Sequence, residues 1–219
     1  MKIETSVGAK SPPVGDESPT PPVVVFLHGR GSDENSAAMF STVFEGARLL
    51  APRGLLPEGG GYAWFRNHGP GIADLASLKD CVNFLEGWTD VHVPPHSNLW
   101  LCGYSNGAAA AGALLLSKPE RYRGAILISG PFVSERPWPV ARLRGLSILM
   151  IYGEDDRVIP RHLLTESASY LAEASGAHAS VLVVPGGHDI SQSSLIATRE
   201  WFAKEVELSQ QAALRSPPP

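Results

Sequence analysis

The stretch LWLCGYSNGAAAAGALLL, residues 99–116, decides the fold of this chain. It begins with a short apolar run typical of a strand buried on both faces and ends with residues that favour a helix. Between them stands Gly103-Tyr104-Ser105-Asn106-Gly107, a G-x-S-x-G pattern in the strand, turn and helix setting that the motif requires. Glycine at both ends lets neighbouring backbone pass close to the turn. The stretch therefore predicts a serine held in a sharp turn at the carboxyl end of a strand.

The rest of the chain repeats this alternation of strand and helix. Short apolar runs predict buried strands at residues 23–27, 98–102, 125–129, 147–152 and 180–184. Helical spacing or composition predicts helices at residues 73–88, 106–117, 161–174 and 191–206. Such alternation is typical of an α/β fold with a mostly parallel central sheet and helices on both faces. In such sheets functional side chains gather at the carboxyl ends of the strands.

Composition limits the size and the partners of the molecule. The chain has 219 residues, of which 43% are hydrophobic, so we expect a single domain over residues 1–219. Residues 1–22 are expected to be an irregular segment with an edge strand at 2–6, and residues 208–219 a frayed tail. The net charge is -4 and the 18 Lys and Arg are dispersed, which argues against a nucleic-acid partner.

We expect a cytoplasmic protein, because the sequence shows no targeting signal and its cysteines fit a reducing compartment. The amino-terminal residues contain no apolar signal region, and no segment approaches the ~20 apolar residues of a membrane span. Cys81 and Cys102 both lie in apolar patterns, so we expect buried, reduced thiols. A homodimer is left open.

Two later strand ends supply partners for the serine. A serine hydroxyl needs a general base within hydrogen-bond reach and a third group that orients the base. His188 stands in Pro185-Gly186-Gly187-His188-Asp189, after the strand at 180–184, and is the candidate base. Glu154, Asp155 and Asp156 follow the strand at 147–152, and we favour Asp156 as the acid over Asp155. The order Ser, Asp, His is that of α/β-hydrolases.

Acyl transfer also needs donors for the oxyanion of the tetrahedral intermediate. The candidates are the backbone N–H of Arg30, in the turn His28-Gly29-Arg30-Gly31 after the first strand, and that of Asn106. A phosphate-binding turn at His28 to Gly31 is the rival interpretation, but the Walker-type and G-x-G-x-x-G patterns are both missing. No histidines have zinc-ligand spacing, so we expect no metal and no cofactor.

The chain resembles the phospholipase/carboxylesterase group of α/β-hydrolases, whose relatives include the acyl-protein thioesterases. The matching pieces are FLHGRGSDE at 26–34, APRG at 51–54, GGGYAWF at 59–65, GYSNG at 103–107, GEDDRVIP at 153–160 and GGHDI at 186–190. The resemblance implies that the acid is the aspartate of a D-x-x-V/I-P pattern, which selects Asp156, and that the first oxyanion donor is Arg30. Asn106 departs from the family, because many members have Gln there.

The candidate triad and the resemblance indicate a serine carboxylesterase that works through an acyl-enzyme, and an open, shallow groove would favour short to medium acyl esters. Acyl thioesters or lysophospholipids are the alternative substrates, and a non-catalytic binding module on the same scaffold is the alternative of another class. Only residues 130–145 separate the strands at 125–129 and 147–152, which leaves no room for a cap domain. His28, Trp64 and Phe65 are candidate substrate contacts, although the aromatic residues in 59–68 could instead pack their loop onto the core.

Overall fold

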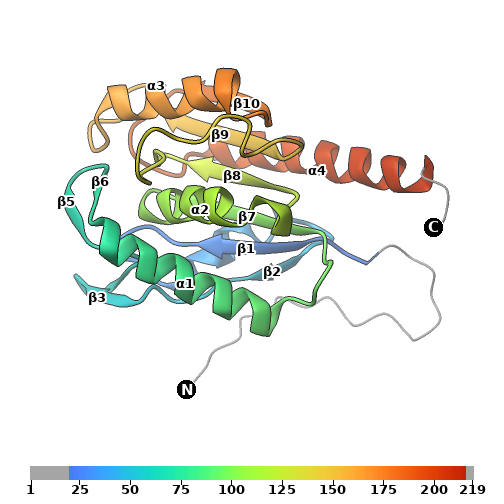
Figure 1. Cartoon of the computed structure of the whole chain (residues 1–219), viewed down its shortest axis with the longest axis horizontal. Helices are drawn as coiled ribbons and strands as arrows, with labels where there is room; N and C mark the ends of the chain where they lie inside the picture. The colour runs from blue at the N-terminus through green and yellow to red at the C-terminus, as the bar shows by residue number, and fades with distance from the viewer. Residues whose placement is uncertain (1–19, 216–219) are drawn as a thin grey trace.

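The computed structural model describes residues 20–215 and contains one six-stranded parallel sheet (Figure 1). Every neighbouring pair of strands in this sheet is parallel. Across the sheet the strands are β10(His178–Val184), β9(Ser147–Gly153), β8(Gly124–Ile128), β7(Leu99–Tyr104), β1(Val23–Leu27) and β2(Arg48–Leu50). The stretch quoted from the sequence therefore supplies a central strand.

Helices cover both faces of the sheet. The α-helices are α1(Leu75–His92), α2(Asn106–Ser117), α3(Arg161–Ser169) and α4(Gln192–Arg215); a π-helical turn, η3(Tyr170–Ala174), extends α3, and η1(Glu34–Phe40) and η2(Pro119–Arg121) are 3-10 helices. In β1, Val23, Val25 and Leu27 belong to one core cluster, packed with α1, α2 and α3. Val24 and Phe26 belong to the other, packed with η1 and α4. This alternation confirms the predicted α/β architecture.

The five long strands are close to the predicted ranges, and all four helices exist. Two ends of helices differ from the prediction. Asp74 caps α1 by accepting a hydrogen bond from the Ser77 amide, and the helix continues to His92. The prediction of a tail frayed from residue 208 is wrong as far as Arg215, because α4 continues through it. Glu, Gln, Ala and Leu dominate those last turns, and these residues have high helix propensity.

Two short hairpins beside the sheet were not predicted. One pairs β3(Leu56–Glu58) with β4(Gly61–Ala63), and the other pairs β5(Asn67–Gly69) with β6(Ile72–Ala73), both antiparallel. Because these strands have two or three residues each, they carry no periodic pattern. They matter because they hold the segment that forms one side of the site.

Residues 129–146, between β8 and β9, contain no helix or strand. This segment bears out the expectation that no cap domain is inserted between these strands. The predicted edge strand at 2–6 lies outside the described residues, and the single-domain prediction for residues 1–219 stays a prediction. Within residues 20–215, no helix combines the length and the apolar character needed to span a membrane.

Cys81 and Cys102 are free and buried, as predicted. Burial raises the pKa of the Cys81 thiol to about 12 and raises the pKa of the Cys102 thiol as well.

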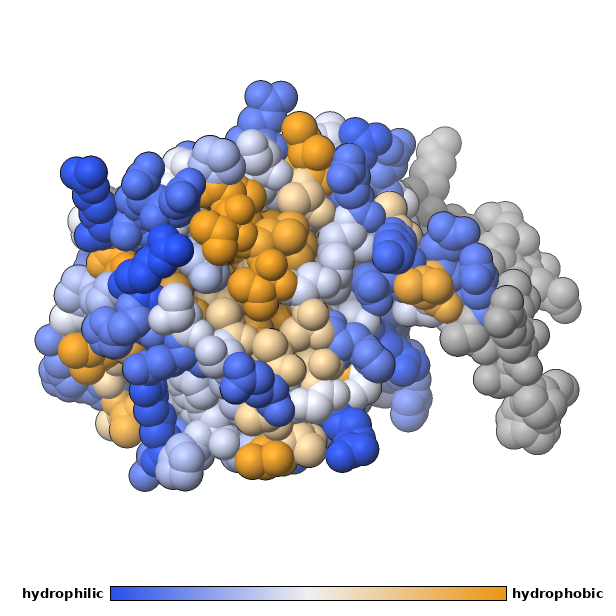
Figure 2. Space-filling model, turned by 90° about the horizontal axis from the view of Figure 1, so that it is seen from above, coloured by the Kyte–Doolittle hydropathy of each residue, from blue (hydrophilic) through white to orange (hydrophobic). Residues whose placement is uncertain are grey.

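One edge of the sheet is formed by β10, which pairs only with β9 in the described part of the chain. Leu182 and Val183 of β10 are exposed. Apolar side chains also gather in the middle of the face that Figure 2 shows from above.

Candidate active site

Ser105 stands in a strained turn between β7 and α2. Its backbone has φ 53° and ψ -116°, a region that residues with side chains rarely adopt. The Ser105 amide donates to the Ile128 carbonyl at 2.8 Å, which ties the turn to β8. A Cβ at Gly107 would lie 2.1 Å from the Leu27 carbonyl oxygen, and a Cβ at Gly103 would lie 2.4 Å from the Gly107 carbonyl oxygen. Both glycines are therefore required by the close approach of β1, β7 and α2.

His188 and Asp156 reach the serine from the loops after β10 and β9. His188 Nε2 lies 2.8 Å from Ser105 Oγ, and His188 Nδ1 lies 2.8 Å from Asp156 Oδ2. The Asp156 side chain is only 1% exposed. Its other oxygen, Oδ1, accepts hydrogen bonds from the amides of Val158 at 2.9 Å and Ile159 at 3.0 Å. The carboxylate is thus held in one orientation against the imidazole.

Asp155, the rival acid, points elsewhere. Its backbone is tied to the histidine loop, because the Asp155 amide donates to the Gly186 carbonyl at 2.9 Å. The residue itself is exposed, as is Glu154, and the side chain of Asp155 makes no hydrogen bond within the described residues. Of the three carboxylates after β9, the structure brings Asp156 alone to His188.

Tyr104 holds the loop that carries His188 in place. Its hydroxyl donates to the His188 carbonyl at 2.8 Å, and its ring centroid lies 5.5 Å from the imidazole centroid. Burial raises the pKa of Tyr104 to about 12, so the hydroxyl keeps its proton at neutral pH. Sequence reasoning missed this residue because it occupies a variable position of G-x-S-x-G, where no pattern marks a hydroxyl as necessary.

The two candidate oxyanion donors lie beside Ser105. Arg30 follows β1, whose residue Leu27 is aligned with Gly103 of the neighbouring strand β7. Asn106 is the first residue of α2, so its N–H has no partner inside the helix. Within residues 20–215 the backbone N–H of Arg30 donates to no other protein group. Both residues line the same cavity as Ser105 and His188.

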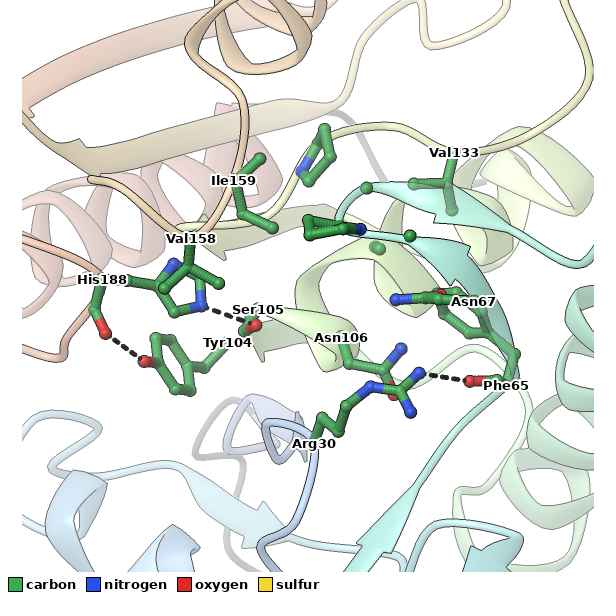
Figure 3. Close-up of a pocket in the computed structure, with 15 residues that line it drawn as sticks. Arg30, Phe65, Asn67, Tyr104, Ser105, Asn106, Val133, Val158, Ile159 and His188 are labelled. Carbon is green, nitrogen blue, oxygen red and sulfur yellow. Dashed lines mark hydrogen bonds between the residues drawn. The ribbon is translucent and has the colours of Figure 1, made fainter. Parts of the chain in front are cut away.

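This cavity is an open groove of about 470 Å³ (Figure 3). Its lining residues come from the loops after β1, β4, β8, β9 and β10, from the end of β7 and the start of α2, and from the hairpin β5–β6; they are Arg30, Phe65, Asn67, Gly69, Pro70, Gly71, Tyr104, Ser105, Asn106, Ala109, Pro131, Val133, Val158, Ile159 and His188. The volume suits a small organic molecule. The sequence analysis singled out the segment 59–68 for its aromatic residues. Asn67, a polar residue of the same segment, was not predicted but lines the groove.

His28 and Trp64, predicted as substrate contacts, are internal instead. Both are fully buried and neither lines the groove. Trp64 Nε1 donates to the His28 carbonyl at 2.8 Å, and the two rings pack with centroids 4.9 Å apart. The Nε2 atom of His28 accepts from the Gly54 amide at 3.0 Å. The polar atoms of His28 and Trp64 are thus used inside the protein to anchor the loop. Phe65, the third predicted substrate contact, does line the groove.

Comparison with known proteins points to one family. A family model described as phospholipase/carboxylesterase matches residues 75–205. MhqD of Bacillus subtilis, which carries the name of a hydrolase, is 29% identical over 189 residues that cover 84% of this chain and 94% of that protein. The carboxylesterase SOBER1 of Arabidopsis thaliana is 24% identical, and the match covers 88% of this chain and 94% of that protein.

Solved structures agree with the sequence comparison. The carboxylesterase of Bacillus cereus superposes with a TM-score of 0.76 at 26% identity, covering 84% of this chain and 89% of that chain. A carboxylesterase from Mesorhizobium loti superposes with a TM-score of 0.74 at 26% identity, covering 83% of this chain and 88% of that one.

Proposed function

The chain belongs to the phospholipase/carboxylesterase family of α/β-hydrolases and is a serine hydrolase of carboxylic esters, and from this premise we propose that Ser105, His188 and Asp156 are its catalytic triad. The observation that carries the proposal is the unbroken chain of two 2.8 Å hydrogen bonds from Ser105 Oγ through the imidazole to Asp156. A non-catalytic module has no need for such a chain.

In the proposed mechanism His188 Nε2 takes the proton of Ser105 Oγ as that oxygen attacks the ester carbonyl. Asp156 accepts a hydrogen bond from His188 Nδ1, which fixes the tautomer and stabilises the imidazolium. The backbone amides of Arg30 and Asn106 donate to the oxyanion, each worth roughly 10² to 10³ in rate. His188 then gives the proton to the leaving alcohol, and a water molecule hydrolyses the acyl-enzyme by the same steps in reverse order.

Short to medium acyl esters are the proposed substrates. A groove of about 470 Å³ without an inserted cap supports this size class. Acyl thioesters are the second class, because the same serine chemistry forms the same acyl-enzyme from them. Hydrolysis of p-nitrophenyl esters with acyl chains of two to about twelve carbons, beside the matching thioesters, would rank the two classes.

The test of the triad is hydrolysis of p-nitrophenyl acetate and butyrate by the wild type, Ser105→Ala and Ser193→Ala. We expect Ser105→Ala to lower kcat by a factor on the order of 10⁶. Ser193 is exposed at the start of α4, and its replacement should leave the rate unchanged. Equal rates in Ser105→Ala and wild type would remove Ser105 as the nucleophile, and a fluorophosphonate label found on another residue would identify the true one.

A further inference from the structure

One side of the groove is lined by polar side chains, and one of them holds a buried hydrogen-bond donor that has no partner among the described residues. We call Arg30, Asn67 and Asn106 the polar wall; across the groove lie the apolar side chains of Val133 and Ile159. Figure 3 shows the polar wall on the side of Ser105 that faces away from His188. A groove for purely aliphatic acyl chains has no use for amide groups at this place.

The Asn106 side chain is fixed with one donor unpaired. Its Oδ1 accepts a hydrogen bond from the Trp64 amide at 2.8 Å, which determines which end of the amide is the oxygen. Its Nδ2 is buried without a hydrogen-bond partner in the described part of the chain, although the residue is only 6% exposed. Leaving a buried donor unsatisfied is costly, so an acceptor atom supplied by a ligand is favoured at this position.

Arg30 and Asn67 add further polar groups beside it. The Arg30 guanidinium donates from Nη1 to the Glu58 carboxylate. Its Nη2 donates to the Phe65 carbonyl at 2.9 Å. These bonds use two of its five N–H donors, so the others remain available. Asn67 Oδ1 is also buried and unpaired, and no hydrogen bond to another described residue fixes which of its amide atoms faces the groove.

The geometry of acyl transfer assigns the polar wall to the acyl part of the substrate. The leaving oxygen must come within reach of His188 Nε2, which lies on the other side of Ser105. The carbonyl oxygen faces the backbone amides. The acyl chain is the remaining substituent of the tetrahedral carbon, so it extends away from His188, along the polar wall.

Resting on the proposed function, we propose that this groove selects esters whose acyl chain carries an oxygen acceptor a few bonds from the scissile carbonyl. Asn106 Nδ2 donates to that oxygen, and the free N–H groups of Arg30 donate beside it. A ketone carbonyl and a carboxylate share this chemistry. Arg30 favours the carboxylate, whereas its ion pair with Glu58 offsets part of that charge.

The experiment compares ethyl 4-oxopentanoate, monoethyl succinate and ethyl pentanoate, which has no acceptor on its chain. Hydrolysis is followed by pH-stat titration, and each kcat/KM is divided by the rate constant for alkaline hydrolysis of the same ester. We expect the wild type to prefer at least one oxygen-bearing ester over ethyl pentanoate about tenfold, the value of one good neutral hydrogen bond. A preference for monoethyl succinate that Arg30→Met removes identifies a carboxylate, and a preference for the ketone ester alone identifies a neutral acceptor.

Asn106→Asp tests the donor itself. Aspartate keeps an oxygen for the Trp64 amide but offers no N–H to the substrate, so the preference should fall to about one. A general loss affects the two neutral esters alike and cancels in their ratio, whereas the added charge also repels monoethyl succinate. The ratio of ethyl 4-oxopentanoate to ethyl pentanoate is therefore the one that tests the donor. An unchanged ratio with an equal loss for every ester would overturn the proposal, because Nδ2 would then act on the oxyanion or the fold. If Asn106→Asp does not fold, the wild type alone decides. A wild-type ratio of one or below for every oxygen-bearing ester over ethyl pentanoate then overturns the proposal.

The two proposals fail in different ways. If hydrolysis depends on Ser105 but shows no preference for an acyl oxygen, the proposed function stands and the polar-wall proposal is wrong. If no ester is hydrolysed in a way that depends on Ser105, both are wrong.

Discussion

At the level of single residues, Asp156 and Asp155 make a matched pair for a test of the acid, because they are adjacent in the sequence but only one of them contacts His188. Asp156 accepts from His188 Nδ1, while Asp155 is exposed. Asp156→Asn should lower kcat for p-nitrophenyl butyrate by up to about 10⁴, because an amide that donates to Nδ1 would stabilise the wrong tautomer. Asp155→Asn should stay near the wild-type rate. A larger loss in Asp155→Asn would show that the acid has been assigned to the wrong residue.

Tyr104 acts on the reaction through His188 and is a positioning residue. Tyr104→Phe removes the hydrogen bond to the His188 carbonyl, so the loop should sample positions in which the imidazole is misplaced. We expect kcat to fall about tenfold with KM little changed. Steady-state kinetics checks this split.

Tyr170→Phe is the control for that substitution. The Tyr170 hydroxyl donates to the Pro139 carbonyl at 2.9 Å, and the residue does not line the groove. This variant should lose a similar amount of stability, about 1 kcal/mol, and keep its kcat. Equal kcat losses in the two variants would mean that the effect of Tyr104 is only one of stability.

At the level of elements, the packing of α2 on β1 depends on a missing side chain. A Cβ at Gly107 would collide with the Leu27 carbonyl, so Gly107→Ala should destabilise the fold by about 1–3 kcal/mol and displace Ser105. Gly87, in α1, has open space where a Cβ would stand. Gly87→Ala should stabilise the protein by about 0.5–1 kcal/mol. Urea midpoints measure both changes, and a stabilised Gly107→Ala would contradict the packing argument.

The elements differ in how far the sequence could predict them. The strands β1, β7, β8 and β9 are apolar runs because they are buried on both faces, and such burial leaves that pattern in any sequence. The apolar run at residues 180–184 was also predicted as a buried strand, but β10 lies at the edge of the sheet and none of its residues is fully buried. The pairs β3–β4 and β5–β6 were missed because each strand is held by its partner and its turn, not by a run of apolar residues. Ser105, Asp156 and His188 follow from strand-end motifs. The roles of Tyr104 and Asn67 could not be predicted, because they depend on contacts between segments distant in the sequence.

At the level of the whole molecule, stability should depend on the protonation of His28. Burial lowers the pKa of His28 below its ordinary value of 6.5. Its Nδ1 lies 2.8 Å from the Gly29 carbonyl and its Nε2 accepts from the Gly54 amide, so a second proton would break the latter bond. The unfolded chain therefore binds a proton that the folded protein does not. Folding stability from this group is present above pH 6.5 and declines as the pH falls below it.

The expected slope is at most about 1.4 kcal/mol per pH unit. His28→Phe cannot titrate, so its free energy of unfolding should fall less steeply below pH 6.5, whatever its absolute stability. Urea unfolding at several pH values compares the two slopes. Parallel curves for both proteins would show that His28 does not control the acid sensitivity.

The backbone of Ser105 also has a consequence for how sequence changes at this position affect thermal resistance. A side chain in that conformation stores unfavourable energy, which glycine would release. Ser105→Gly should therefore melt at a higher temperature than Ser105→Ala, by the equivalent of about 1 kcal/mol, although neither can form an acyl-enzyme. Selection for thermal resistance alone would thus drive this position toward glycine, and a serine persists there only under selection for turnover.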